Sequence, residues 1–288
     1  MEVKIFSFSH KSVDYLDKLS QNIVPVGVGK NKFPNNWLDT NVGENINYKH
    51  FAYAEMAGQY WVWKNYILKN LNKDIWIGFS QYRRHWIKDH SLVDKLYYSS
   101  LANFFFKVFI RRLASSRVTF YSSYLRSVYQ KYFHNTVSPP INIYDLSKDI
   151  FSEAPKTWNN YDVILTQPIF LGENIRDQYC TTAQVHSDCF DQIISQMPFN
   201  MQNDFNNYTR KSSYLSAHNM YIATPKVLNE YFTFLFNFYE KTEDIFNQEK
   251  NSKIIEIPRF YGHLNERISD FWFKNFKRFR TLPMRFLS

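Results

Sequence analysis

The stretch DIWIGFSQYRRHW, Asp74–Trp86, decides the fold and raises the question of function. Its apolar run from Ile75 to Phe79 is typical of a short buried strand. The strand delivers a polar tetrapeptide, Gln81 to Arg84, to its carboxyl end, and ligands of open α/β sheets bind at that edge. Charge alone favours a simpler interpretation, in which the two arginines are a solvated pair after a strand.

The segments before this strand predict a doubly wound sheet. VKIFSFS (3–9) reads as a first strand, residues 12–19 as a short helix, and NIVPVGVG (22–29) as a second strand. A turn-rich segment then leads into a long helical pattern over residues 48–71, with apolar residues three and four apart, which feeds the strand beginning at Ile75.

The later segments continue the α/β pattern. We expect a core strand within 161–171, one helix containing AQVHSDCFDQII (183–194), a strand over 218–225, a long helix over 226–249 and a last helix over 262–276. Residues 91–134 are basic and aromatic, which predicts an inserted helical subdomain. The whole chain, 1–288, is therefore predicted to be a single α/β domain with this insertion.

Composition narrows the function classes. A formal charge of +9 favours anionic partners, but no zinc-finger spacing, RNA-recognition motif or basic region before heptads is present, so we expect no nucleic acid partner. Two cysteines, Cys180 and Cys189, are too few for a disulfide framework and indicate a reducing compartment. The sequence contains neither a signal-peptide pattern nor an apolar run of membrane-spanning length, so we predict a cytoplasmic protein.

Two segments suggest contact with a membrane surface. FFFKVFIRR (104–112) and FWFKNFKRFRTLPMRFL (271–287) interleave aromatic residues with lysine and arginine, as interfacial segments do. This pattern predicts peripheral association with an anionic surface, at the inner face of the cytoplasmic membrane. Ordinary helix packing with basic outer faces is the alternative left open.

Several separated motifs together resemble one family, the bacterial capsular and O-antigen polysaccharide synthesis glycosyltransferases that include galactofuranosyltransferase-like enzymes. The motifs cover most of the chain apart from 91–134; they are Ser9-His10-Lys11, Gly43-Glu44-Asn45-Ile46, Glu55 with YWVWKN (60–65), IGFSQYRRHW (77–86), Gln178-Tyr179, His186, Asp188, His218-Asn219-Met220 and Glu266-Arg267-Ile268. Each motif alone is weak evidence for the family, and it is the ordered set of motifs that is specific to it. One departure is Gln81, which stands where the family pattern has histidine and which cannot act as a base.

The resemblance implies a GT-A-like, Rossmann-type mixed sheet flanked by helices. It implies transfer of a hexose, such as galactofuranose or galactose, from a UDP-sugar donor to a growing capsular, O-antigen or lipooligosaccharide glycan. The acceptor would be a glycan or a lipid-linked glycan. Donor and acceptor identity rest on the resemblance alone.

Such a transfer requires stabilisation of a pyrophosphate leaving group. GT-A enzymes usually use a divalent metal on Asp-x-Asp at the end of a core strand, whereas this strand ends in Gln81-Tyr82-Arg83-Arg84. Guanidinium groups donate paired hydrogen bonds to phosphate oxygens and stay charged. We therefore predict that Arg83, Arg84 or both replace the metal and that no cofactor is required, with Mn²⁺ or Mg²⁺ left open.

Further candidates for the nucleotide-sugar site come from the same motifs. The set comprises His10, Lys11, Asp39, Asn45, Lys64, Gln81 and Tyr82. His10 and Lys11 follow the first strand, where a diphosphate approaches an open sheet, although an incidental basic pair is equally consistent. Asp39 and Asn45 would contact ribose or uracil, or serve as cap and turn residues, which is the more frequent role. Lys64 lies beside Trp63 and could reach a phosphate.

Acceptor and catalytic candidates lie in the second half. His186, Asn219 and His263 are predicted to face the acceptor or sugar, with a buried strand-end amide as the alternative for Asn219. Glu266, which enters the last helix, is predicted to be the general base of an inverting transfer, and Asp188 is the second candidate. A surface glutamate paired with Arg267 or Lys274 is the alternative for Glu266.

Two other functions compete with sugar transfer. One is a non-catalytic, basic, peripheral-membrane component of a glycan assembly complex with a degenerate site. The other is a phosphotransferase or nucleotidyltransferase using the same basic pocket, which would need a metal-binding carboxylate pair that no motif supplies. Histidine spacing typical of a metal site and the Gly-x-Ser-x-Gly element of hydrolases are likewise missing from the sequence.

Overall fold

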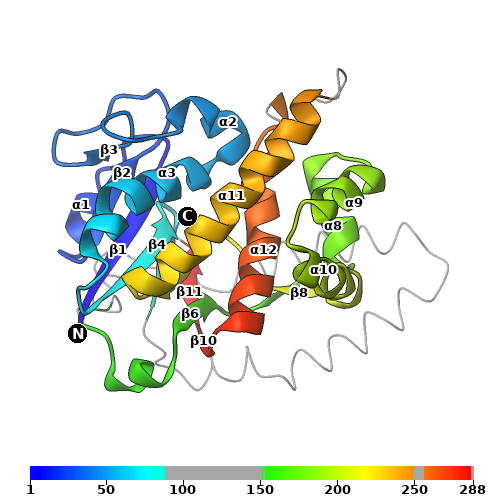
Figure 1. Ribbon diagram of the computed structural model, residues 1–288. Helices are drawn as coiled ribbons and strands as arrows, with labels where there is room; N and C mark the ends of the chain where they lie inside the picture. Colours follow the sequence, from blue (N-terminus) through cyan, green and yellow to red (C-terminus); the bar gives the residue numbers. More distant parts are fainter. Residues whose placement is uncertain (88–150, 152, 249–255, 287–288) are drawn as a thin grey trace.

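The computed structural model of the chain describes residues 1–87, 151, 153–248 and 256–286 (Figure 1). The predicted insertion at 91–134 and the aromatic segment 104–112 lie outside the described residues. A central sheet runs in the order β10-β6-β9-β4-β1-β2-β3. The strands are β1 (Glu2–Ser9), β2 (Ile23–Gly27), β3 (Leu38–Asp39), β4 (Ile75–Gln81), β6 (Val163–Thr166), β9 (Tyr221–Ala223) and β10 (Phe279–Leu282).

The sheet is mixed and mostly parallel, which confirms the predicted fold class. β1 pairs in parallel with β2 and β4, whereas β9 is antiparallel to both β4 and β6. From β1 the chain moves outward to β2 and β3, and it then returns to the other side of β1 as β4. The carboxyl ends of β1 and β4 therefore meet at the point where the strand order reverses, which is where open α/β sheets bind ligands.

Helices cover both faces of the sheet. They are α1 (Leu16–Leu19), α2 (His50–Tyr53), α3 (Glu55–Val62), α8 (Ile175–Ala183), α9 (Ser187–Ser195), α10 (Phe199–Lys211), α11 (Pro225–Gln248) and α12 (Phe260–Phe276). Phe6, Phe8 and Phe79 pack with α3, α11 and α12 on one face, while Val3, Ile5 and Trp76 pack with α1 on the other. The larger core thus lies under α11 and α12.

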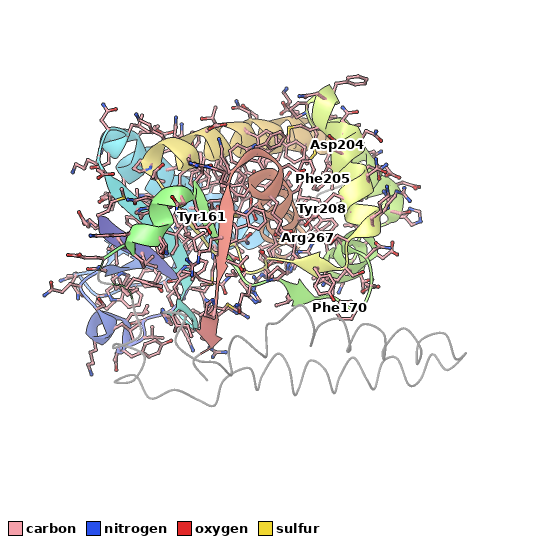
Figure 2. All side chains as sticks on the ribbon, turned by 90° about the horizontal axis from the view of Figure 1, so that it is seen from below. Tyr161, Phe170, Asp204, Phe205, Tyr208 and Arg267 are labelled. Carbon is pink, nitrogen blue, oxygen red and sulfur yellow. The ribbon has the colours of Figure 1, made fainter. Side chains whose placement is uncertain are left out.

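A helical lobe of α8, α9 and α10 packs against α12 on the side away from β1 (Figure 1). Figure 2 shows Phe205, Tyr208 and Arg267 in the layer between α10 and α12. The rings of Phe205 and Phe271 are 5.1 Å apart, and the Tyr208 hydroxyl donates to the buried carboxylate of Asp270. Short strands β7 (Ile169–Phe170) and β8 (Tyr214–Leu215) pair beside this lobe.

Two sequence predictions about elements need correction, and one helix was missed. The helix expected over 183–194 is two helices, because Gln184 adopts a left-handed conformation (φ 55°) that ends α8. The helix pattern over 48–71 is broken at Ala54 (φ 50°, ψ −130°). Helix α10 was not predicted; it begins after Pro198, and most of its residues are polar.

The first three aromatic residues of the C-terminal segment belong to the core, whereas Phe276 and Phe279 further along it are 47% and 39% exposed. Phe271, Trp272 and Phe273 are at most 5% exposed, so these aromatic residues are packed inside the protein. The chain then forms β10 and β11 (Met284–Phe286), which pair with β6 and with β5 (Arg84–Trp86). Among the described residues, no helix is long and apolar enough to cross a membrane.

Phe79 of β4 provides a test of this core. It is fully buried, with its ring centroid 5.3 Å from that of Tyr221 and 5.8 Å from that of Phe232. Phe79→Ala should lower the free energy of unfolding by about 3–5 kcal/mol, because burial is lost and a cavity remains. Urea denaturation measures this loss. Phe199→Ala is the matched control, since Phe199 is 90% exposed and its loss should change stability little; equal effects would contradict the packing described.

Candidate functional site

The end of β4 forms a tight turn that presents two arginines in different environments. Gln81 and Arg84 pair across the turn, Tyr82 and Arg83 form its tip, and the Arg84 guanidinium donates to Gln81 Oε1. Gln81 Nε2 donates to Glu55 Oε1 (3.1 Å) and to the carbonyl oxygen of His218 (3.0 Å). Gln81 therefore joins β4, α3 and the segment before β9, with both ends of its amide engaged.

Glu55, the first residue of α3, lies at the centre of this arrangement. Its side chain is 9% exposed, and its Oε1 also accepts a hydrogen bond from Asn219 Nδ2 (2.8 Å). Its Oε2 lies 3.5 Å from Nη2 of Arg259, whose side chain is 51% exposed. One oxygen of Glu55 is thus fixed by amides, and the other faces an accessible cation.

Backbone strain is concentrated around Glu55. Ala54 precedes Glu55, and Asn219 and Arg259 contact the Glu55 carboxylate. The Gln81 amide that donates to Glu55 also donates to the carbonyl oxygen of His218. These four belong to the five non-glycine residues with positive φ in the described chain: Ala54, Gln184, His218, Asn219 and Arg259. Such conformations cost on the order of 1–3 kcal/mol each and cluster at functional sites.

Gly262 allows α12 to approach this kink closely. A Cβ at this position would lie 3.2 Å from the Ala54 Cβ and 3.4 Å from the Tyr53 carbonyl oxygen. The Gly262 carbonyl also accepts a hydrogen bond from Asn219 Nδ2 (2.9 Å). A glycine near the start of α12 therefore brings this helix, which carries Glu266, against the helix that carries Glu55.

Glu266 lies in the adjacent part of the site. Its Oε1 accepts the His218 backbone N–H (2.8 Å), and its Oε2 lies 2.7 Å from Nη1 of Arg267, which is buried. Burial alone would raise the pKa of Glu266, but the charge of Arg267, then His218 and His263, and the His218 N–H more than offset it. The pKa of Glu266 is consequently held below its ordinary value, so the carboxylate is ionised at neutral pH.

Arg84 lies within the field of both carboxylates. Burial lowers the pKa of Arg84, while the negative charges of Glu266 and then Glu55 act in the opposite direction. Arg84 is half-buried, so it is not part of a fully solvated arginine pair. Arg83 is exposed, as that simpler interpretation predicts.

A cationic rim surrounds the ring of Tyr82. Lys11 Nζ lies 5.6 Å from the ring centroid and the Arg83 guanidinium carbon 5.2 Å from it, and the His10 ring meets Tyr82 edge-on at 5.3 Å. Burial, followed by the charges of Lys11, Arg83 and Arg259, lowers the pKa of His10. The ends of β1 and β4 thus bring together four of the predicted donor-site residues, as the strand order requires.

The end of β2 adds a histidine to this edge. Gly29 (φ 96°) leaves room for the His50 ring, whose Nδ1 would be 3.4 Å from a Cβ at that position. Burial lowers the pKa of His50; the negative charge of Glu55 opposes this, and the charges of His10 and Arg259 add smaller contributions in the direction of burial. Asn47 holds this loop, since it accepts the Gly29 N–H (2.9 Å) and donates to the Gly29 carbonyl (2.9 Å).

Asn219 and His263, two of the predicted sugar contacts, lie at the same cluster. Asn219 is 2% exposed, and its amide also accepts a hydrogen bond from Asn265 Nδ2 (2.8 Å), so it is the buried strand-end amide of the alternative interpretation. His263 is half-buried; burial lowers its pKa, and the charges of Arg267 and Arg259 act in the same direction against those of Glu266 and Glu55. His263 therefore lies within the field of both carboxylates.

Asp39, the last residue of β3, and Asn45 each use their side chain to stabilise the loop that follows. Asp39 Oδ1 accepts the Asn41 N–H (2.8 Å), and Asn45 Oδ1 accepts the Asn47 N–H (3.1 Å), so each side chain closes a turn two residues long. Their loop borders the Gly29 end of the site, because Asn41 also donates to the Gly29 carbonyl (3.1 Å).

Lys64, His186 and Asp188 lie elsewhere. Lys64 is paired with Glu44 (3.2 Å), and nine residues separate it from Glu55 along the helix, a distance of about 13 Å. His186 and Asp188 form an exposed pair (3.2 Å) at the start of α9, in the lobe of α8 to α10. The structure does not bring these three to the Gln81–Glu55 cluster in its present arrangement.

Three residues of the site were not assigned a role from sequence: Glu55, His50 and Arg259. Glu55 was part of a recognised motif, but a glutamate in the first turn of a helix is common, because it interacts favourably with the helix dipole, and so does not by itself indicate a site. Arg259 follows Pro258, and nothing in the neighbouring sequence indicates that its backbone contacts α2. Among the described residues, no group of three or more His, Cys, Asp or Glu side chains is arranged to hold a metal ion.

Chemically, this edge combines cations suited to phosphate oxygens with two largely buried carboxylates, Glu55 and Glu266. Lys11, Arg83, Arg84 and Arg259 supply the positive charge, and the nearby strand ends and helix starts hold their positions. Such a site can bind an anionic leaving group beside a proton acceptor.

Comparison with known proteins agrees with this architecture. The fold is similar to a solved apo structure of WbbM, described as a bifunctional glycosyltransferase, with a TM-score of 0.62 and 19% identity. The match covers 100% of this chain and 46% of the WbbM chain, so the chain spans about half the length of that protein. Nothing among the curated proteins matches. The model of a family described as a domain of unknown function, DUF4422, matches residues 4–278, and the chain therefore belongs to the DUF4422 family.

Proposed function

We propose that this protein is a nucleotide-sugar-dependent glycosyltransferase. It transfers a hexose, galactofuranose or galactose, from a UDP-sugar to a growing capsular, O-antigen or lipooligosaccharide glycan. The observation that carries the proposal is the cluster of arginines and carboxylates at the reversal point of the strand order. The similarity of fold to WbbM supports it, as does the resemblance of the sequence motifs to those of capsular glycosyltransferases.

In the proposed reaction, an acceptor hydroxyl oxygen attacks the anomeric carbon of the donor. The bond from that carbon to the phosphate oxygen breaks, its electron pair leaves with UDP, and the acceptor proton passes to a carboxylate. Arg83 and Arg84, with His10 and Lys11 beside them, stabilise the charge on the diphosphate. Glu266 is the proposed base, since its carboxylate is held in the ionised form and its charge acts on Arg84.

Calorimetric titration with UDP, followed by a screen of UDP- and GDP-sugars for donor hydrolysis, tests the proposal. We expect UDP to bind and at least one UDP-hexose to be hydrolysed slowly without acceptor. A silent titration with every nucleotide would favour the alternative, a non-catalytic basic component of a glycan assembly complex on an anionic membrane surface. Flotation with anionic liposomes would then be the direct measurement of that role.

We further propose that transfer does not require a divalent metal. The turn after β4 carries Gln81, Tyr82, Arg83 and Arg84, and guanidinium groups there supply positive charge to the leaving group. Activity should therefore persist in EDTA, measured as UDP release from the donor found in the screen. Complete loss in EDTA with recovery on adding Mn²⁺ or Mg²⁺ would refute this proposal.

A further inference from the structure

Arg259 occupies an unusual position for a long charged side chain at the start of a helix. Its backbone is left-handed (φ 59°, ψ 19°), and its N–H donates to the Phe51 carbonyl (2.8 Å), which fixes α12 to α2. Its carbonyl accepts the His263 N–H (2.8 Å) and so continues into the helix. A non-glycine residue keeps such a conformation only where its surroundings impose it.

The side chain of Arg259 pairs with Glu55, and its charge also acts on several groups at this edge of the sheet. After burial, which is the larger cause in each case, the charge of Arg259 contributes to lowering the pKa of His10, His50, Arg84 and His263. His10 follows β1, His50 begins α2, Arg84 begins β5, and His263 lies in α12. Arg259 is therefore a shared neighbour of groups that converge from four parts of the chain.

The contact between Arg259 and Glu55 is loose enough for an incoming anion to replace Glu55 as the partner of the arginine. The Nη2–Oε2 distance of 3.5 Å is long for a charge-assisted hydrogen bond, and the arginine is half-exposed. The other oxygen of Glu55 is held by Gln81 and Asn219 and need not move when the arginine leaves. An incoming anion offers Arg259 a more accessible partner, with Lys11 and Arg83 on the same edge.

We propose that Arg259 is an anion clamp that moves from Glu55 to the diphosphate of a nucleoside-diphosphate sugar, and that Glu55 Oε2, once released, accepts a hydroxyl of the bound sugar. The inference rests on the proposed function and adds to it a phosphate ligand and a sugar ligand. Donor binding and the opening of the sugar site are thereby coupled, because one guanidinium cannot serve both partners.

Titrations with UDP, uridine and inorganic pyrophosphate test the clamp. We expect Arg259→Gln to weaken UDP and pyrophosphate binding about tenfold or more, as loss of a charge-assisted hydrogen bond requires, with uridine affinity unchanged. Glu55→Gln should tighten UDP binding, because Arg259 is then no longer held by a carboxylate. Arg210→Gln is the matched control, since it removes one positive charge from the exposed face of α10 and should leave all three affinities unchanged at moderate salt.

The outcomes separate this inference from the proposed function. If wild-type protein binds pyrophosphate but no nucleotide, the proposed donor class is wrong, while weakened pyrophosphate binding in Arg259→Gln would still support the clamp. If Arg259→Gln binds UDP and pyrophosphate like wild type, or loses uridine equally, the clamp is overturned. Wild-type protein that binds none of the three probes, or weaker UDP binding in Glu55→Gln, would also overturn it.

Discussion

Arg84→Ala should lower turnover by about a hundredfold or more, the effect expected for one electrostatic stabiliser of a leaving group. The side chain is positioned by Gln81 and lies within the field of Glu55 and Glu266, so its charge is held in place before any substrate arrives.

Arg83→Ala should also lower turnover by orders of magnitude. Because Arg83 is exposed at the tip of the turn, a larger part of its effect should appear in UDP affinity.

The measurement is kcat and KM for UDP release, together with UDP affinity and thermal stability. Arg84→Ala removes a half-buried cation whose charge acts on Glu55 and Glu266, so a loss of folding must be separated from a loss of catalysis. Arg84→Lys serves this purpose, because lysine keeps the positive charge but lacks the paired donors of the guanidinium group. This variant should fold normally and recover only part of the rate. Arg210→Ala, on the exposed face of α10, is the remote control. Full activity in Arg84→Ala would show that Arg84 does not stabilise the leaving group.

The sequence could predict the parts of the site that lie on strands. A strand is recognisable from its apolar run, and the reversal of strand order brings its polar end next to that of β1, so His10, Lys11, Tyr82 and Arg83 were expected together. The inferences about these four residues need only the order of elements and not their exact packing. Glu266, in the last helix, was proposed instead by analogy with GT-A enzymes.

Residues placed by irregular backbone could not be predicted in the same way. Glu55 enters the site because Ala54 interrupts a helical pattern that the apolar spacing alone would continue. Arg259 enters because its own φ is positive, and its pairing with Glu55 joins residues far apart in the chain. Positive φ at alanine and arginine is contrary to local preference, so tertiary contacts such as Gly262 against Ala54 decide it.

Helix α10 and the C-terminal strands show the same limit for the fold. Residues 199–211 are mostly polar, and three of them, Met201, Phe205 and Thr209, are buried against neighbouring elements. The tail alternates aromatic and basic residues, which fits an interfacial segment as well as the end of α12 followed by β10. Only the partners of each segment, α12 for α10 and β6 for β10, distinguish these possibilities.

Glu266→Gln should lower sugar transfer by roughly a hundredfold or more while UDP binding is retained. The pKa of Glu266 is held below its ordinary value although burial opposes this, because Arg267, His218 and His263 favour the charged form. The wild-type rate should therefore stay constant as pH falls through the neutral range and decline only in the acidic range. Transfer to a glycan acceptor at several pH values, with thermal stability alongside, measures both effects.

A chemical rescue separates a missing base from a disturbed site. Azide needs no deprotonation, so Glu266→Gln should form glycosyl azide from the donor at a rate close to that of wild-type protein, whereas Arg84→Ala should not be rescued. Glu55→Gln and Asp188→Asn are the matched carboxylate variants: Glu55 lies in the same cluster, and Asp188 is exposed at the start of α9. If Glu266→Gln transfers normally to the glycan, the base is another carboxylate, and whichever variant loses transfer but recovers with azide identifies it. If Glu266→Gln loses transfer and azide restores nothing, its carboxylate serves to hold His218 and Arg267 in place, because only a base becomes dispensable when the nucleophile arrives without a proton.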